Sequence, residues 1–190
     1  MARHPDVPPV ILPTRRPKET PAMLTDNLLI ALRIALVSLL AYQLGASFTA
    51  LFHASSASVG GLWSAVSGVV VLQATRRDTW TSAGLRVLGT AIGALISAVY
   101  LSLLPFSTPG MAASVFATVL LCQLARIPDH ARLASITVMV IMVIAHLSPG
   151  LNPVHSALLR FAEAFIGTAV AVLAVLAWPQ NGRPASAAAH

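Results

Sequence analysis

Charged residues are scarce in this sequence. Asp, Glu, Lys and Arg together make up 9% of its 190 residues, whereas 56% of the residues are hydrophobic. A soluble domain carries about 25% charged residues, because its surface must face water. With a mean hydropathy of +0.79, the chain cannot cover a soluble core with polar surface. The composition therefore predicts an integral membrane protein.

Acidic residues and cysteine are also few, which restricts the available chemistry. The chain has six acidic residues and one cysteine, Cys122, so no disulfide can form within it. The six histidines are scattered, without the close spacing of metal ligands. The sequence shows neither paired carboxylates nor a combination of Ser, His and Asp that would indicate an enzyme or a cofactor site. A glycine-rich nucleotide-binding loop is absent too, so any transport would draw on an ion gradient.

What the sequence does contain is a series of apolar runs. A bilayer core about 30 Å thick is crossed by a helix of about 20 apolar residues. Runs of this kind predict six transmembrane helices, at residues 27–46, 59–74, 83–103, 109–125, 132–147 and 155–178. The predicted fold class is therefore all-α, with one six-helix membrane domain over residues 27–179.

The segments that flank this domain differ in composition. Residues 1–26 contain six prolines and several basic residues, with few residues that could form a core. We therefore expect a disordered basic arm in the cytoplasm. Residues 180–190 are expected to form a disordered cytoplasmic tail. The chain begins without the compact apolar region of a secretory signal, so the first span is expected to remain in the mature protein.

Basic residues predict the orientation of the helices. Lys and Arg in short loops remain on the cytoplasmic side of a membrane. Here they precede the first span, join the second to the third and the fourth to the fifth, and follow the sixth; beyond the arm they are Arg76, Arg77, Arg126, Arg132 and Arg183. Both termini are therefore predicted to lie in the cytoplasm. This orientation explains the net charge of +6. The sequence has no cluster of basic residues interleaved with aromatics, which would indicate nucleic-acid binding.

Three residues recur in the second half of the chain at a constant offset of 74 positions. The pairs are Arg86 and Arg160, Gly93 and Gly167, and Pro105 and Pro179. Because each half has three spans, the second half runs across the membrane in the opposite direction. This predicts a 3+3 inverted repeat, whose substrate site lies near the midplane. The second and fifth spans correspond at this offset and are both short, at about 16 residues, which is a further pointer to the site.

Three arginines lie within the predicted spans, where a charge is costly and usually faces a cavity or a partner. Arg33, Arg86 and Arg160 would form a basic track across the membrane, of the kind that attracts anions. Arg160 would lie at the outer end of its span, against the usual preference for basic residues inside. Alternatively, each side chain extends its head group to the membrane surface along its apolar stem.

Glu163 is the one carboxylate within a predicted span. It stands three residues after Arg160 and so shares its helix face. Such a pair lowers the cost of both charges, and acids within membranes often carry protons. Glu163 would therefore couple protons to transport, or else form a purely structural ion pair.

Glycines and polar residues complete the candidate transport path. Gly89 and Gly93 in the third span and Gly167 in the sixth would admit a substrate, with close helix packing as the alternative. Trp63 and Gln73 in the second span add an aromatic surface and a polar group. Trp63 is alternatively an anchor at the membrane surface.

Three segments of the sequence resemble a known superfamily. They are residues 61–73, 79–94 and 160–179, which contain Trp63, the pattern Arg86-x-x-Gly89-Thr90, and a run from Arg160 to Pro179. These segments are similar to spans two, three and six of the fusaric acid resistance and aromatic acid exporter superfamily, and the resemblance covers roughly residues 27–179. It implies a multi-pass protein of the bacterial inner membrane that exports aromatic or other small organic anions.

Larger exporters of this group carry two six-helix units and a soluble region, whereas this chain has one unit. We therefore expect a homodimer or a higher homo-oligomer, surrounded by membrane lipids. The predicted function is secondary export of small organic anions, in particular aromatic carboxylates. An organic-anion channel and a non-transporting subunit of a larger membrane assembly are the alternatives.

Overall fold

The computed structural model describes residues 21–147, 150 and 152–177. All regular structure in these residues is helical: α1 (Pro21–Phe52), the short 3₁₀ helix η1 (Ala54–Ser56), α2 (Ala57–Val71), α3 (Arg76–Leu103), α4 (Thr108–Leu124), α5 (Pro128–Leu147) and α6 (Pro153–Ala177). Five helices, with η1 and α2 counted together, are long and apolar enough to cross a membrane, and α4 is shorter at 17 residues. The prediction of an all-α membrane protein is confirmed.

Large apolar side chains cover the outside of the bundle. Leu95 of α3, Phe116 of α4 and Leu173 of α6 are 66%, 70% and 63% exposed. Soluble monomers rarely expose large continuous apolar patches, whereas leucine and phenylalanine are stable against lipid. The surface therefore agrees with a position inside a bilayer.

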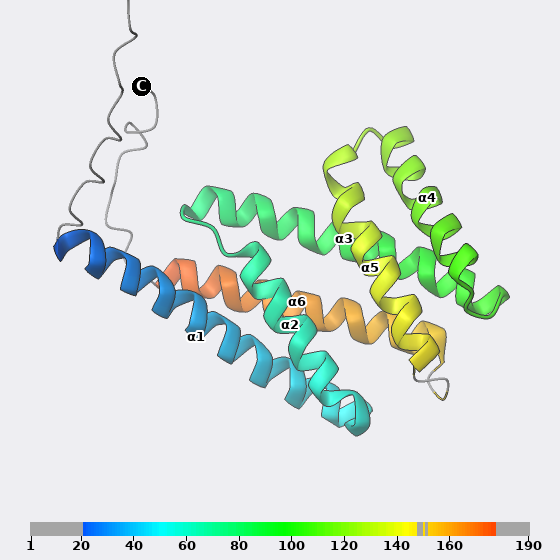
Figure 1. Ribbon diagram of the computed structural model, residues 1–190, viewed down its shortest axis with the longest axis horizontal. Helices are drawn as coiled ribbons and strands as arrows, with labels where there is room; N and C mark the ends of the chain where they lie inside the picture. The colour runs from blue at the N-terminus through cyan, green and yellow to red at the C-terminus, as the bar shows by residue number, and fades with distance from the viewer. Residues whose placement is uncertain (1–20, 148–149, 151, 178–190) are drawn as a thin grey trace, which may run out of the picture.

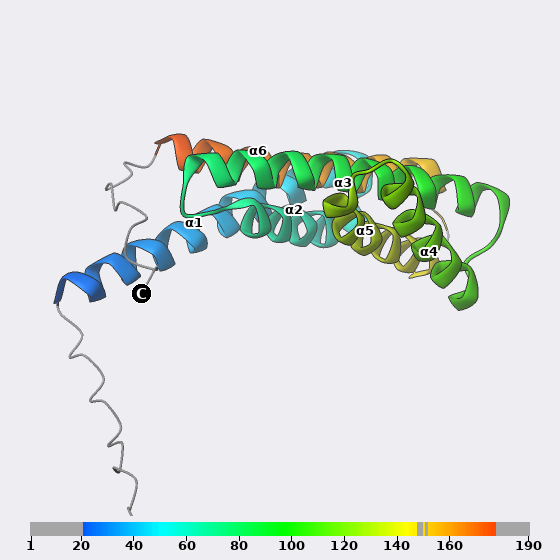
Figure 2. The same ribbon diagram turned by 90° about the horizontal axis from the view of Figure 1, so that it is seen from above.

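Helices α3 and α6 lie side by side at the centre of the bundle (Figure 1). Helix α2 packs on α6 and is joined there by α1, while α5 packs on α3 and is joined by α4. Figure 2 shows α3 and α6 in one layer, with α2 and α5 in the layer beneath them. Each central helix is thus covered by helices from the other half of the chain.

Local features set the start of α3 and both ends of α4. Thr75 caps α3, because its hydroxyl oxygen accepts a hydrogen bond from the backbone N–H of Asp78 at 3.1 Å and donates to the Asp78 carboxylate at 2.7 Å. Ser107 caps α4 by accepting a backbone hydrogen bond at 3.1 Å. Arg126, with a left-handed φ of 60°, turns the chain between α4 and α5.

The helices differ from the predicted spans mainly at their beginnings. Helix α1 begins at Pro21, so the last six residues of the predicted disordered arm are helical; residues 1–20 and the predicted tail lie outside the described residues. Helix α3 begins seven residues early, because Thr75 caps it. Arg86 consequently lies ten residues inside α3, about 15 Å along its axis. Helix α5 has 20 residues and α2 has 15, so the prediction that the second and fifth spans are both short is wrong.

Two glycines allow close contacts between helix backbones. A Cβ atom on Gly167 of α6 would overlap the backbone of Ser64 and Gly68 in α2. A Cβ atom on Gly93 of α3 would overlap the backbone of Ala134 in α5. Small residues at helix contacts let backbones approach in this way. The two glycines, which correspond at the 74-residue offset, therefore bring α2 and α5 against the two central helices.

Candidate functional site

A buried ion pair lies on α6. Arg160 Nη2 is 2.7 Å from Glu163 Oε1, and the two side chains are 1% and 0% exposed. Their spacing of three residues places both on one helix face. Thr49 of α1 donates its hydroxyl to the same carboxylate oxygen at 2.6 Å. The Glu163 carboxylate therefore ties α1 to α6.

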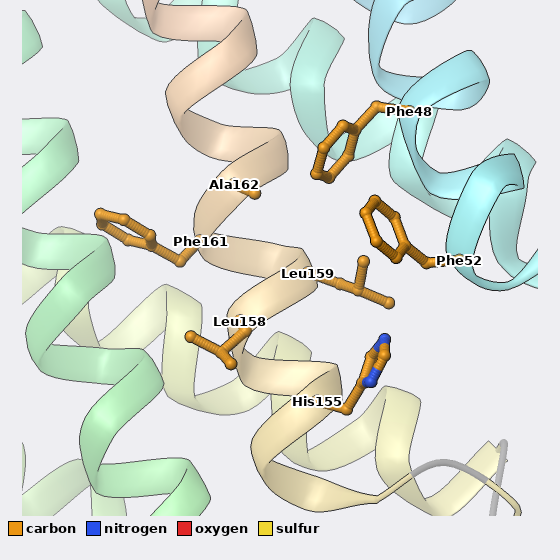
Figure 3. A pocket seen from close by; sticks show the side chains of 7 residues that line it. All are labelled: Phe48, Phe52, His155, Leu158, Leu159, Phe161 and Ala162. Carbon is orange, nitrogen blue, oxygen red and sulfur yellow. The ribbon is translucent and has the colours of Figure 1, made fainter.

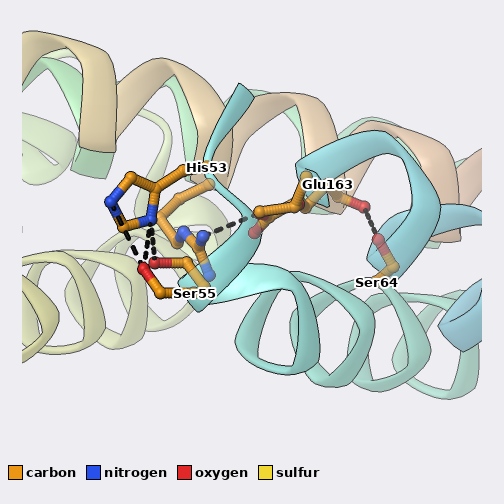
Figure 4. A network of polar contacts seen from close by, with 7 residues as sticks. His53, Ser55, Ser64 and Glu163 are labelled. Carbon is orange, nitrogen blue, oxygen red and sulfur yellow. Dashed lines mark hydrogen bonds and ion pairs between the residues drawn. The ribbon is translucent and has the colours of Figure 1, made fainter. Parts of the chain in front are cut away.

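Helix α2 closes this site from a third side. Ser64 Oγ donates to the backbone oxygen of Glu163 at 2.7 Å (Figure 4). One turn earlier on α2, a Cβ atom on Gly60 would overlap Thr49 and crowd the Glu163 carboxylate. Glycine at this position leaves room for the carboxylate. The ion pair thus lies at the junction of α1, α2 and α6.

A second buried guanidinium reaches α2 from α3. Arg86 is 1% exposed, and its Nε and Nη2 donate to Ser67 Oγ at 3.1 and 2.9 Å. Its guanidinium carbon is 4.7 Å from the centroid of the Trp63 ring, which is within cation–π range. Ser67 stands three residues after Ser64, so Arg86 and Glu163 contact α2 within one turn of each other.

Several polar atoms of this cluster have no hydrogen-bond partner within the part of the chain that the structure describes. They are Arg160 Nε and Nη1, Glu163 Oε2 and Trp63 Nε1, and all are buried. A buried polar atom without a partner costs about 1–3 kcal/mol, and more when it is charged. The cluster therefore has donors to offer a bound oxyanion, and an acceptor at Glu163 that can take a proton.

A family model described as fusaric acid resistance protein-like matches residues 44–174. The chain belongs to this family. The resemblance noted in the sequence is thereby confirmed, and the chain is a multi-pass membrane protein of a transporter family. No curated protein and no solved structure matches it. The match to the fusaric acid resistance protein-like family spans Thr49, α2, Arg86 and the ion pair, and leaves Arg33 outside.

Gln73, Gly89 and Gly93 of the predicted path lie away from the charge cluster, whereas Gly167 lies against Ser64, which donates to Glu163. Gln73 is exposed at the end of α2, where its side-chain nitrogen donates to Val70 O at 3.2 Å. Gly89 and Gly93 lie at the contact of α3 with α5, and Gly167 lies at the contact of α6 with α2. The three glycines therefore have a packing role in this structure.

The predicted track of three arginines is also divided. Arg33 is half-buried and lies one turn before Val37, which packs in a cluster with Val170 of α6. Arg160 lies ten residues earlier on α6, beyond the reach of this cluster. Arg86 and Arg160 are both 1% exposed, so their head groups lie inside the bundle and do not extend to the membrane surface.

Trp63, 7% exposed with Arg86 over its ring, is not a surface anchor. Three neighbours of the ion pair, Gly60, Ser64 and Thr49, are absent from the predicted path. The sequence does contain a pattern that indicates the α2 contact, because Gly60, Ser64 and Gly68 recur every four residues and form one face of small residues. No sequence pattern indicates the contact of Thr49 with Glu163, because the two residues are 114 positions apart.

Proposed function

We propose that this protein exports small organic anions, in particular aromatic carboxylates, as a secondary carrier in the bacterial cytoplasmic membrane. The proposal rests on the Arg160–Glu163 pair, which is buried inside a transmembrane bundle and has donor and acceptor atoms without a partner among the described residues. Charged residues in such a position are typical of substrate and ion pathways. Family membership supports transport in general.

Arg160 is the group that we propose for anion binding. Its Nη2 is paired with Glu163, while Nε and Nη1 meet no acceptor in the part of the chain that the structure describes and so have hydrogen atoms to donate. A substrate carboxylate would accept charge-assisted hydrogen bonds there, which are shorter and stronger than neutral ones. Arg86, held over Trp63, adds a second positive charge that offsets the loss of water from the anion.

Glu163 sets the charge of the loaded site. With Arg86 and Arg160 positive, Glu163 negative and one bound carboxylate, the loaded site is neutral, and the empty site carries one net positive charge. A membrane potential that is negative inside draws the empty site back inward, by about 2.3 kcal/mol per 100 mV. A proton on Glu163 would give the loaded site one net positive charge, so Glu163 links substrate movement to both gradients.

The degree of burial favours a carrier over a channel. Arg86, Arg160 and Glu163 are at most 1% exposed, so this conformation is closed at the charge cluster. A continuous pore would keep its charged lining in contact with water. A carrier instead opens the site to one side at a time, by rocking one half against the other.

The packing of the helices supports the proposed inverted repeat. Helix α2 packs on α6 as α5 packs on α3, and the two central helices pack on each other. The start of α1, the connection from α2 to α3 and the end of α6 lie at one end of the bundle (Figure 1). Arg76 and Arg77 are exposed at this end. We propose that it faces the cytoplasm.

Single cysteines test this orientation. Cysteine at Ala54 or Gly150 is expected to react in intact cells with a thiol reagent that does not cross membranes, and cysteine at Ala74 or Ala125 is not. All four positions are exposed, so burial does not bias the result, and the native Cys122 is 1% exposed. Reaction at Ala74 from outside would show that the orientation is reversed.

The transport proposal is tested by exchange of labelled for unlabelled 4-hydroxybenzoate across proteoliposomes at pH 8, with empty liposomes as background. A carrier exchanges substrate faster than it releases it, whereas a channel does not. The parent, whose loaded site is neutral, should exchange at the same rate with and without an inside-negative potential. The potential is expected to slow exchange by Glu163→Gln threefold or more, because it holds the positively charged loaded site toward the vesicle interior.

Three outcomes would contradict this mechanism. Equal rates of exchange and release would favour an organic-anion channel. No exchange of any organic anion by correctly inserted protein would favour a non-transporting subunit. Equal dependence on potential in the parent and in Glu163→Gln would remove Glu163 from the charge-moving step.

We further propose a homodimer or higher homo-oligomer, which light scattering in mild detergent would distinguish from a 19.8 kDa monomer.

A further inference from the structure

An aromatic groove lies on the bundle between the end of α1 and the first half of α6. Its volume is about 330 Å³, and its lining includes Phe48, Phe52, His155, Leu159 and Ala162. Figure 3 shows the two α1 phenylalanines, His155 and Leu159 gathered on one side of α6, while Phe161 projects on the other side. By the proposed orientation, the groove lies in the outer half of the membrane.

The rings in the groove are inclined to one another. Phe48 and Phe52 have centroids 5.1 Å apart at 54°, and Phe52 and His155 have centroids 6.4 Å apart at 66°. Aromatic pairs favour such inclined geometry, in which the edge of one ring meets the face of another. A dry cavity of about 150 Å³ already holds benzene. The groove therefore has space for an aromatic ring with a substituent.

The groove and the buried ion pair flank the same contact between α1 and α6. On α1, Phe48 lines the groove and the next residue, Thr49, donates to Glu163. On α6, Leu159 lines the groove and directly precedes Arg160, and Ala162 directly precedes Glu163. The groove thus lies across the α1–α6 contact from Arg160, whose Nε and Nη1 have no partner among the described residues.

We propose that this groove binds the aromatic ring of the transported anion, with its carboxylate directed across the α1–α6 contact to Arg160. The inference rests on the proposed function and adds the place and chemistry of the ring site. A lipid acyl chain would fill the same apolar space, but it would supply no carboxylate for Arg160. The lining of two phenylalanines and a histidine also favours a ring over a flexible chain.

Two matched substitutions test the ring site. Ala162→Leu fills the aromatic groove, and Ala98→Leu fills a second groove, of about 250 Å³, on the α3 side of α6. Binding of 4-fluorobenzoate and of fluoroacetate is measured by fluorine NMR on protein in lipid nanodiscs, where acyl chains compete for both grooves. The parent is expected to bind 4-fluorobenzoate at least tenfold more tightly than fluoroacetate. Ala162→Leu should weaken 4-fluorobenzoate at least tenfold and leave fluoroacetate unchanged, while Ala98→Leu changes neither.

The outcomes separate this inference from the proposed function. Equal binding of the two probes by the parent, or equal effects of Ala162→Leu and Ala98→Leu, would overturn the ring site even if the transport assay succeeds. A change of oligomeric mass in Ala162→Leu without a change in binding would identify the groove as a contact between copies, and would also overturn it. If Arg160→Gln leaves both probes bound as in the parent, the proposed role of Arg160 in anion binding is wrong. The proposal that the substrate carboxylate is directed to Arg160 is then wrong as well. Selective loss of 4-fluorobenzoate in Ala162→Leu would still support the ring site in that case.

Discussion

Replacing Arg160 with glutamine is expected to destabilise the protein by about 3–5 kcal/mol, the usual cost of removing one partner of a buried ion pair. Glu163 is 0% exposed, so its charge cannot turn to water when the guanidinium is lost. Within the described ranges of the chain, one hydrogen bond to the carboxylate would remain, from Thr49 at 2.6 Å. The midpoint of unfolding in mild detergent, followed by circular dichroism, measures the change.

A double-mutant cycle measures the interaction between Arg160 and Glu163 apart from their contacts with other residues. Glu163→Gln alone should cost less than Arg160→Gln, because the amide oxygen still accepts from both Arg160 and Thr49. The double variant should recover part of the loss of Arg160→Gln, since no unpaired charge is left buried. Arg132→Gln, on an exposed position of α5, is the control and should change stability by less than about 0.5 kcal/mol. Additive losses in the cycle would mean that the two side chains act independently.

Arg160→Gln should also reduce exchange of 4-hydroxybenzoate by about a hundredfold in protein that still folds. This corresponds to a change of about 2.8 kcal/mol in free energy. Glutamine keeps a hydrogen-bonding amide but removes the positive charge, and hydrogen bonds to charged groups are worth about 1.5–3 kcal/mol. Exchange by the double variant separates the two effects. If it regains stability and also regains parent exchange, the pair is structural and the substrate binds elsewhere.

Hydropathy was sufficient to predict an all-α membrane protein with a helix in each apolar run. Each of the six apolar runs contains a helix, because backbone groups within a membrane must bond to one another along the segment. The ends were less predictable, since a search for apolar residues stops at polar ones. Arg76, Arg77 and Asp78 were excluded from the third span, yet the Thr75 cap begins α3 there. As a result, Arg86 was predicted near the start of its span, and it lies ten residues inside α3.

The charge cluster was only partly visible in the sequence. Arg160 and Glu163 stand out because charges are rare in apolar runs, and their spacing of three residues predicts the contact that the structure shows. The partners of this pair come from α1 and α2, and single-sequence periodicity carries no information about which helix packs on which. The cation–π contact of Arg86 with Trp63 was inaccessible for the same reason.

Replacing Arg86 with glutamine is expected to slow exchange of 4-hydroxybenzoate tenfold or more, which corresponds to about 1.4 kcal/mol. Arg86 bonds to Ser67 through two nitrogens and covers the ring of Trp63. Glutamine is too short and uncharged to make the cation–π contact, which is worth about 2 kcal/mol when it is shielded from water. The charge that helps to hold an anion near α2 is lost with it.

Arg86→Lys distinguishes the effect of the positive charge from the effect of the planar guanidinium group. Arg86→Lys keeps the positive charge but has no planar group to stack on Trp63 or to donate two hydrogen bonds in a fixed geometry, so exchange should lie between the parent and Arg86→Gln. Arg77→Gln is the matched control, because Arg77 lies nine residues earlier on the same helix and is exposed; its exchange should equal that of the parent. If Arg86→Gln and Arg77→Gln exchange equally well, Arg86 serves the packing of α3 on α2 and has no part in anion movement. A loss in Arg86→Lys as large as in Arg86→Gln would show instead that the stacked geometry, and not the charge, is what transport needs.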